Sequence, residues 1–165
     1  MLKSKNIFLR ALQPTDVEHI FKWENNPENW ENSGTSRSYT KEEISEFVND
    51  KQDLEKSNQF RFIICLNLTD EPIGAIDLFE YNTQKSIVGV GILIAEKENR
   101  RRGFAKESLN LISNYCRNEL NIVNLFCNIK KDNVSSICLF ENNGFKFIEE
   151  KNLFKRKVNY YEKTL

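Results

Sequence analysis

The chain has 165 residues and a mass of 19.4 kDa, which predicts a single domain over residues 1–165 with a substantial core. Its 24 basic and 24 acidic side chains cancel, which argues against a general nucleic-acid binder. No apolar run approaches the roughly 20 residues of a membrane span, and residues 1–12 lack the hydrophobic segment of a signal peptide. We therefore expect a cytoplasmic protein that binds neither nucleic acid nor a membrane.

The cysteines and the single histidine, His19, do not form a recognisable metal or catalytic pattern. A zinc site needs ligands at short spacing, and a Cys/His pair or a Ser-His-Asp triad needs a well-placed histidine. His19 falls in an amphipathic stretch and is better explained as a helix residue. We expect no metal site, and we interpret four thiols as buried and reduced: Cys65, Cys116, Cys127 and Cys138.

The balanced net charge hides an acidic segment. Residues 16–55 contain eleven acids and four bases, an excess of seven negative charges, and the rest of the chain is equally positive. A negative segment can attract cationic ligands. Helical surfaces are also often acidic for solubility alone, and both interpretations stay open here.

The first third of the chain predicts one strand and two helices. Residues 7–12 have the apolar content of a strand, and residues 14–16 supply the start signals of a helix. Residues 25–40 are rich in Asn, Glu and Ser, which predicts a long loop. A second helix follows, because Thr40 and Glu43 have the spacing of a capping box.

The rest of the chain, from residue 60 onward, predicts six strands and two helices. Three apolar runs joined by short polar segments predict an antiparallel meander. A long amphipathic helix, a strand of alternating apolar residues and a short helix that ends at a glycine come next, and two strands complete the chain. The order is β-α-α-β-β-β-α-β-α-β-β. From the meander onward, the elements cover residues 60–68, 72–81, 86–95, 103–119, 123–129, 133–143, 145–150 and 155–165.

The turn before the long helix is the most informative segment. Arg100, Arg101 and Arg102 precede Gly103 at the predicted start of that helix. Backbone N–H groups at a helix N-terminus attract anions, and basic side chains there oppose the helix dipole unless a ligand neutralises them. Gly103 lets the backbone approach such a ligand, and Ala105 keeps the next position small. The turn predicts a phosphate site, without a Walker A or dinucleotide glycine pattern.

Two segments resemble the GNAT family of N-acetyltransferases. Residues 100–105 match its Q/R-x-x-G-x-G/A motif, and residues 133–145 resemble its N-x-x-S…E-[KN]-x-G-F signature. Residues 9–28 resemble the RimJ/RimL-like branch, and residues 73–82 are similar to a strand of bacterial spermidine/spermine N-acetyltransferases. With the order of elements, the resemblance covers essentially the whole chain. It implies an α/β (α+β) fold with a mixed, mostly antiparallel sheet of about seven strands and about four helices.

The resemblance also implies where acetyl-CoA binds. The coenzyme is expected in a V-shaped gap between the fourth and fifth predicted strands, with backbone groups of the fourth strand along its pantetheine arm. The basic turn would hold the pyrophosphate, and the short helix would supply further contacts, although its first residue is equally explained as a helix cap. The expected coenzyme residues are Ile92, Leu93, Ile94, Arg101, Arg102, Gly103, Phe104, Ala105, Lys106, Asn133, Ser136 and Phe140.

Candidates for proton transfer are fewer. Asp77 and Glu80 match acids in the polyamine enzymes, and a separation of three in a strand predicts that at most one faces the cleft. We favour Glu80 as the base, because it lies nearer the strand end, but an ordinary solvent-exposed surface role explains it at least as well, and a water relay is a further alternative. The strand that precedes the basic turn has Gly89 where peptide acetyltransferases often carry a glutamate.

The group that would protonate the leaving thiolate is where this chain departs from the family pattern. Many members have a tyrosine where this chain has Phe140, and phenylalanine donates no proton. Ser136, a water or Tyr160 must substitute, or the thiolate leaves without an acid, which its ordinary pKa near 8.5 makes tolerable. Ser136 is also explained as an ordinary residue of a first helical turn.

The sequence therefore predicts an acetyl-CoA-dependent N-acetyltransferase. The expected acceptor is a primary amine of a polyamine-like small molecule or of a protein or peptide N-terminus, and Glu24, Glu28 and Glu31 near the acceptor side favour a cationic one. The alternative is a non-catalytic acyl-CoA-binding regulatory module, which Phe140 keeps open. Many relatives dimerise, so a homodimer is possible.

Overall fold

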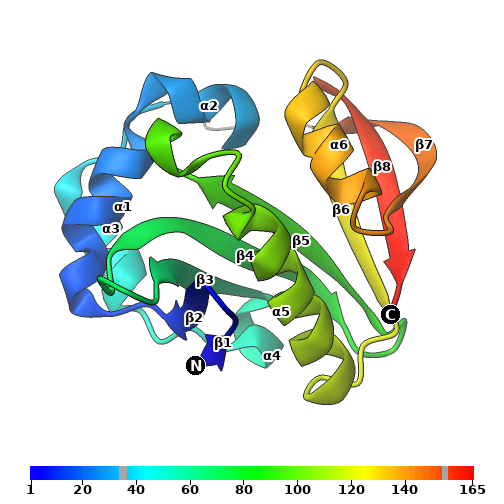
Figure 1. Cartoon of the computed structure of the whole chain (residues 1–165), viewed down its shortest axis with the longest axis horizontal. Helices are drawn as coiled ribbons and strands as arrows, with labels where there is room; N and C mark the ends of the chain where they lie inside the picture. The colour runs from blue at the N-terminus through cyan, green and yellow to red at the C-terminus, as the bar shows by residue number, and fades with distance from the viewer. Residues whose placement is uncertain (34–36, 154–155) are drawn as a thin grey trace.

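The computed structural model describes residues 1–33, 37–153 and 156–165, with one eight-stranded sheet (Figure 1). The strand order is β1-β2-β3-β4-β5-β6-β8-β7, and every neighbouring pair is antiparallel except β5 and β6. The strands are β1 (Leu2–Lys3), β2 (Ile7–Ala11), β3 (Gln59–Leu66), β4 (Pro72–Asn82), β5 (Ile87–Ile94), β6 (Asn124–Lys130), β7 (Lys146–Leu153) and β8 (Arg156–Thr164).

Helices cover both faces of the sheet. The long helix α5 lies across one face, and α1 and α3 lie together on the opposite side of the molecule from α6 (Figure 1). Both faces of β3 are buried, since Phe62 and Ile64 belong to the core beneath α5, whereas Ile63 and Cys65 belong to the core beneath α1 and α3. The helices are α1 (Val17–Glu24), α2 (Pro27–Ser33), α3 (Lys41–Asn49), α4 (Leu54–Ser57), α5 (Phe104–Asn118) and α6 (Val134–Glu141).

The predicted fold class is confirmed, with more elements than expected. The described residues form eight strands instead of about seven and six α-helices instead of about four. Strand β1 and helix α4 are two and four residues long, too short to produce a periodic pattern. Helix α2 occupies seven residues of the expected loop over 25–40; its sequence lacks an apolar stripe, although Pro27 at its first position is a helix-start signal. Residues 34–36 lie outside the described residues.

Local caps explain where the helices begin. The Thr40 hydroxyl accepts a hydrogen bond from the Glu43 amide at 3.2 Å, and the Glu43 carboxylate accepts one from the Thr40 amide at 2.8 Å, as a capping box requires. Helix α5 follows Gly103, which has φ +87°, and α6 follows Asn133, whose Oδ1 accepts from the Ser136 amide at 3.1 Å. These helices are two to three residues shorter than the predicted ranges.

The parallel pair β5–β6 is paired over only three residues of each strand. The register joins Ile87 to Asn124 and ends with Gly89 opposite Phe126. Beyond that point β5 stays paired with β4 as far as Ile94, while β6 stays paired with β8 as far as Lys130. The two strands therefore separate in the middle of the sheet, where the sequence predicts the coenzyme gap.

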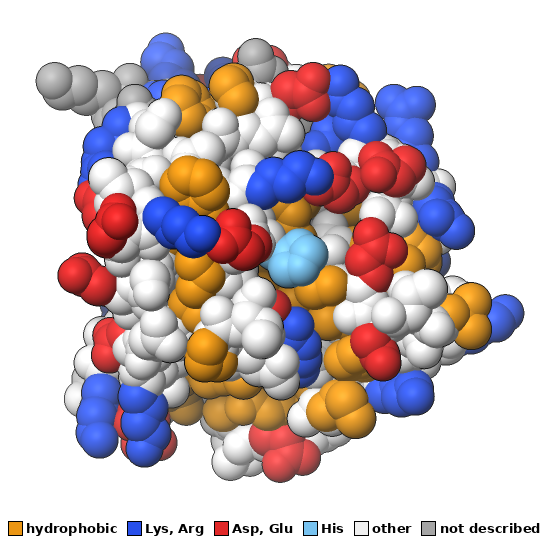
Figure 2. Space-filling model, turned by 90° about the vertical axis from the view of Figure 1, so that its left-hand side faces the viewer, with side chains coloured by type: hydrophobic (Ala, Val, Ile, Leu, Met, Phe, Trp, Pro, Cys, Tyr) orange, Lys and Arg blue, Asp and Glu red, His pale blue; other side chains and the backbone are white. Residues whose placement is uncertain are grey.

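Ion pairs neutralise much of the acidic segment. Asp16 accepts two hydrogen bonds from Arg10, Glu28 pairs with Lys97 at 2.6 Å, and Lys41 pairs with Glu18. On the face in Figure 2, which views the left-hand side of Figure 1, red and blue side chains are interspersed. This part of the surface carries no single negative field. Among the described residues, no helix is both long and apolar enough to cross a bilayer.

The cysteines are free thiols, and three of them are buried. Burial raises the pKa of Cys116 to about 12, so this thiol stays protonated and unreactive at neutral pH. Cys138 is exposed on α6, which corrects the expectation that all four are buried.

Candidate active site

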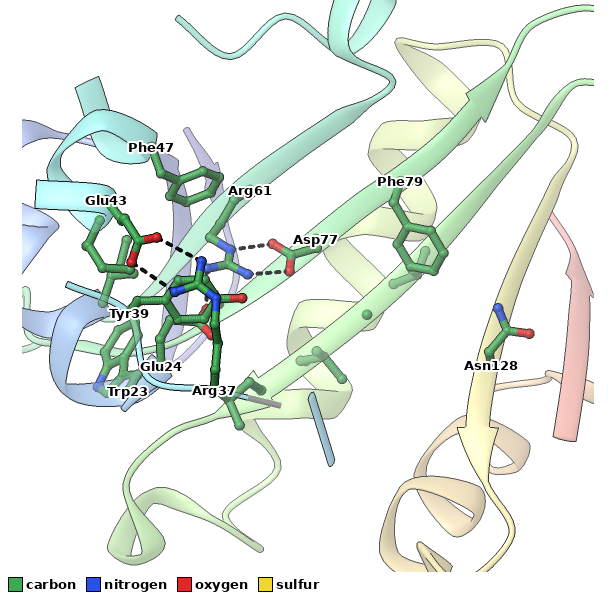
Figure 3. Close-up of a pocket in the computed structure, with 17 residues that line it drawn as sticks. Trp23, Glu24, Arg37, Tyr39, Glu43, Phe47, Arg61, Asp77, Phe79 and Asn128 are labelled. Atoms are coloured by element: carbon green, nitrogen blue, oxygen red, sulfur yellow. Dashed lines mark hydrogen bonds and ion pairs between the residues drawn. The ribbon is translucent and has the colours of Figure 1, made fainter. Parts of the chain in front are cut away.

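A pocket of about 690 Å³ lies where β5 turns away from β6. Its wall combines α1, α3, β3, β4 and β5 with one residue of β6, Asn128, which stands across the gap from the others in Figure 3. The lining residues are Ile20, Trp23, Glu24, Arg37, Tyr39, Glu43, Ile44, Phe47, Arg61, Ala75, Asp77, Phe79, Val90, Gly91, Ile92, Leu93 and Asn128.

An ion-paired arginine forms the centre of the pocket wall. Arg61 on β3 is the register partner of Asp77 on β4, and its Nε and Nη2 donate to the two carboxylate oxygens at 2.7 and 2.8 Å (Figure 3). Its Nη1 donates to Glu24 Oε1 at 2.8 Å. Burial alone would lower the pKa of Arg61, but the charges and hydrogen bonds of Asp77 and Glu24 outweigh burial and raise it. The guanidinium is permanently charged.

A second arginine pairs with α3. Arg37 donates through Nη1 and Nη2 to the two carboxylate oxygens of Glu43 at 3.0 and 2.8 Å. The hydrogen bond from Arg37 and the backbone N–H of Thr40 lower the pKa of Glu43 to about 2. The Arg37 guanidinium also lies 4.6 Å from the Tyr39 ring centre.

The pocket lining is aromatic and slightly acidic. Three carboxylates face two guanidinium groups, which leaves one excess negative charge when all are ionised. Four aromatic rings complete the wall, and aromatic faces attract cations. The pocket suits a cationic organic ligand, and its rings are those of Trp23, Tyr39, Phe47 and Phe79.

The two candidate bases lie in different places. Asp77 lines the pocket, and both of its oxygens accept hydrogen bonds from Arg61. Glu80 is exposed and is not among the pocket residues; its φ of +50° coincides with a register shift in β4 between Phe79 and Asn82. A bulge of this kind changes which way the following side chains point. Only one of the two carboxylates lines the pocket, as expected, but the bulge rather than regular strand alternation sets the direction of Glu80.

Phe79 explains why position 89 is a glycine. The Phe79 ring lies where a Cβ on Gly89 would be, and it makes an edge-on contact with Phe126 at 5.4 Å between ring centres. A glutamate at position 89 would have to displace this ring. The Phe79 ring therefore occupies the space that a side chain at position 89 would need.

The basic turn has the features of an anion site. Arg101, Arg102 and Lys106 are exposed, and nothing lies within 4 Å of a Cβ built on Gly103. The first backbone N–H groups of α5 have no acceptor within the helix, by helix geometry. Open space in front of a helix N-terminus with cations around it fits a pyrophosphate group. Phe104 is buried in the core, so its ring is not exposed at this turn.

Arg100 has a different role from its two neighbours. Its Nε donates to the Ile94 carbonyl and its Nη2 donates to the Ala95 carbonyl and to Asn29 Oδ1, each at 3.0 Å. Asn29 on α2 is only 1% exposed. Arg100 therefore joins α2 to the end of β5, and these contacts engage its Nε and Nη2.

The expected residues of α6 divide into surface and core. Asn133 caps the helix, and Ser136 is half-buried in its first turn. Phe140 is 3% exposed and packs edge-on against Phe145 with ring centres 4.9 Å apart. Phe140 is thus a core residue, and its ring offers no proton.

Tyr160, the tyrosine expected as a substitute acid, is already engaged. Its hydroxyl donates to Glu162 Oε1 at 2.6 Å. Burial and the neighbouring glutamate raise its pKa above the ordinary value. A phenol in this state is a weaker acid than a free tyrosine.

Sequence reasoning missed most of the pocket wall. Arg61, a cation inside the apolar run over 60–68, was the available signal, because a charged residue inside a buried strand needs a partner. Asn128 gave a similar but weaker signal in the run over 123–129. The aromatic residues gave none, since aromatic side chains are ordinary in cores.

Comparison with known proteins identifies the family. The model of the acetyltransferase (GNAT) domain matches residues 6–146. The chain belongs to the GNAT family. A curated relative, the N-acetyltransferase 9-like protein of Caenorhabditis briggsae, is 28% identical over 153 residues, which cover 87% of this chain and 76% of the relative.

Solved structures share the GNAT fold. Spermidine N-acetyltransferase from Vibrio cholerae, solved with CoA and spermine, has a TM-score of 0.84 at 22% identity and covers 96% of this chain and 95% of its own. AAC(6')-Ib, solved with paromomycin and acetyl-CoA, has a TM-score of 0.81 at 17% identity, with coverages of 97% and 94%. Together with the family match, these findings confirm the expected GNAT N-acetyltransferase that uses acetyl-CoA.

Proposed function

We propose that this GNAT domain acetylates a primary amine of a small, positively charged molecule. The pocket carries the proposal, because it combines an excess carboxylate with four aromatic rings beside the gap between β5 and β6. A cationic amine gains both Coulomb attraction and cation–π contact there. Structural relatives solved with spermine and with paromomycin support the same class. Peptide N-termini, the RimJ/RimL-like placement, a cytoplasmic location and a homodimer stay predictions.

The residues that we propose to bind the coenzyme lie on β5, beside the gap between β5 and β6, and at the starts of α5 and α6. Backbone groups of Ile92, Leu93 and Ile94 face the widening gap and suit the amide groups of pantetheine. The first turn of α5 suits the pyrophosphate, with Arg101, Arg102 and Lys106 around it. Asn133 and Ser136, at the start of α6, are the proposed coenzyme contacts on the β6 side of the gap. Acetyl-CoA supplies the activated acyl group, and the chain orients it.

Transfer requires a neutral amine at the thioester carbonyl. The amine lone pair forms the new N–C bond, the C–S bond breaks with its electron pair on sulfur, and the nitrogen loses one proton. Asp77 is the carboxylate of β4 within the pocket, but taking a proton would neutralise its ion pair with Arg61. Water that leads to bulk solvent is therefore the simplest proton acceptor, and the thiolate takes up a proton afterwards.

The first test is amine-dependent release of CoA from acetyl-CoA. The panel contains spermidine, spermine, kanamycin, amino acids and short peptides with N-terminal Ala or Ser, at pH 7 and pH 9. Turnover of the polyamines or kanamycin is expected, with little activity on the peptides. Peptide turnover alone would contradict the cationic small-molecule acceptor. Tight acetyl-CoA binding without any turnover would favour the regulatory alternative.

The role of Glu80 as a base is tested by Glu80→Gln. If Glu80 were the base, its variant would lose more activity at pH 7 than at pH 9, where free amine is abundant. We expect parental activity for Glu80→Gln at both pH values, because this side chain lies outside the pocket lining. A selective loss at pH 7 would restore Glu80 as the base.

A further inference from the structure

Asn128 carries a buried polar atom that the fold does not satisfy. Among the described residues, no donor lies within hydrogen-bond distance of its Oδ1, although that atom is buried. An unpaired buried carbonyl oxygen costs stability. Asn159 on β8 has the same defect. A residue that lowers stability without forming a bond invites a functional explanation.

The two asparagines lie on opposite faces of the sheet. Asn128 is the register partner of Tyr160, whereas Asn159 is the partner of Ile129, and side chains alternate between faces along a strand. Ile129 belongs to the core beneath α5. Only Asn128 lines the pocket, where it stands alone on β6 across the gap from Asp77 and Phe79 (Figure 3).

Position along the strand places Asn128 where β5 and β6 have separated. The pairing of β5 with β6 ends at Phe126, so Asn128 lies two residues beyond the point where the strands separate. Regular pairing would have put it opposite Gly91, which adds no side chain to the gap. An acyl group lying in this gap and an amine entering from the pocket would meet next to the Asn128 carboxamide.

The missing partner of Oδ1 is a donor, and an amine supplies one. On the opposite wall, both oxygens of Asp77 and both oxygens of Glu43 already accept hydrogen bonds from arginines. The terminal torsion of asparagine is broad, so the carboxamide can turn its oxygen into the gap at little cost. Resting on the proposed function, we propose that Asn128 Oδ1 accepts a hydrogen bond from the acceptor amine and positions its nitrogen for attack.

Two matched leucine variants test this role. Asn128→Leu and Asn159→Leu each remove one unpaired oxygen, so both are expected to melt at or above the parental temperature. Only Asn128→Leu is expected to lower kcat/KM for the best amine of the panel, by about tenfold or more, as the loss of a hydrogen bond at an attacking group predicts. The Kd for acetyl-CoA should stay at the parental value in both variants.

Asn128→Asp keeps an acceptor oxygen and loses the amide donor. We expect it to retain most of the parental kcat/KM. If Asn128→Leu does not fold, Asn128→Ala, which also lacks the carboxamide oxygen, takes its place with the same expected loss. Parental activity in Asn128→Leu would overturn the inference, as would an equal loss in Asn128→Asp, which would assign the role to the amide nitrogen. A Kd for acetyl-CoA that weakens as much as kcat/KM falls would assign Asn128 to the coenzyme instead.

The two proposals fail differently. If the proposed function is wrong, the parental protein itself releases no CoA with any amine, and the role of Asn128 falls with it. If the parent turns over and Asn128→Leu matches it, only the assignment of Asn128 is overturned.

Discussion

The basic turn at residues 100–106 and the pocket wall around Arg61 both depend on arginines, but these arginines lie in opposite surroundings. Arg101 and Arg102 are exposed, and the ion pairs of the described residues do not include them. Arg61 instead is enclosed by two carboxylates. Cations left exposed at a helix start are available to an anion, whereas a neutralised cation holds a wall in shape.

The largest expected effect breaks the turn. Gly103→Glu places a carboxylate where a pyrophosphate is expected, and juxtaposed like charges cost several kcal/mol, so acetyl-CoA binding should weaken about a hundredfold or more. Gly103→Ala is the control, because it carries the same strain at φ +87° without the charge. Calorimetric titration with acetyl-CoA measures both. Equal affinity of the two variants for acetyl-CoA would contradict an anion site at this turn.

Arg61→Met removes the ion pairs at the centre of the pocket wall. Removal of the guanidinium leaves the carboxylates of Glu24 and Asp77 partly buried without their partner, and the free energy of unfolding should fall by about 2–3 kcal/mol. Urea titration measures the change. The triple variant Arg61→Met, Asp77→Leu, Glu24→Met should recover most of the stability, because no uncompensated charge remains. A parental midpoint in the single variant would contradict the structural role of Arg61.

The aromatic part of the same wall is tested by Gly89→Ala. Its Cβ would collide with the Phe79 ring, and overpacking of this kind costs about 1–3 kcal/mol. Gly91→Ala is the matched control on the same strand, since the nearest Phe79 atom would be 3.7 Å from its Cβ, an ordinary contact. Thermal melts should rank Gly91→Ala near the parent and Gly89→Ala below it. The reverse order would mean that Phe79 packs elsewhere.

The smallest effect concerns the exposed pair of Arg37 and Glu43. Because its pKa in the folded protein is lowered from 4.5 to about 2, the ionised Glu43 stabilises the fold above pH 4.5, and this contribution is lost as the pH falls toward 2. The stability difference between the parent and Glu43→Gln should therefore shrink over that window. Repeating the comparison in an Arg37→Met background should flatten it. A difference that is constant from pH 7 to pH 2 would contradict the pairing.

The turn was predictable from sequence because its parts are consecutive. Six residues, 100–105, contain the cations, the glycine and the helix start, and the second signature begins at Asn133. The meander and the capping box at Thr40 were equally local, and they were predicted correctly. Arg100 was the exception within the turn, because its partner Asn29 is 71 residues away.

The wall was not predictable because tertiary pairing assembles it. Arg61 meets Asp77 only through the β3–β4 register, and Glu24 reaches Arg61 from a helix 37 residues earlier in the chain. The preference for Glu80 over Asp77 rested on its position nearer the strand end, but the register shift after Phe79 lies there, and Glu80 is exposed outside the pocket lining. A bulge leaves no clear mark in a single sequence.

The hydrogen bonds of Arg100 bear on how this enzyme could be redesigned. Arg100 and Lys97, both in the segment between β5 and α5, contact Asn29 and Glu28 of α2. Substitutions on α2 would therefore disturb the loop that leads to the basic turn. Trp23, Tyr39 and Phe47 line the pocket from other segments. Libraries aimed at new acceptors should diversify these three positions and keep α2 intact, so that acceptor preference can change while coenzyme affinity is preserved.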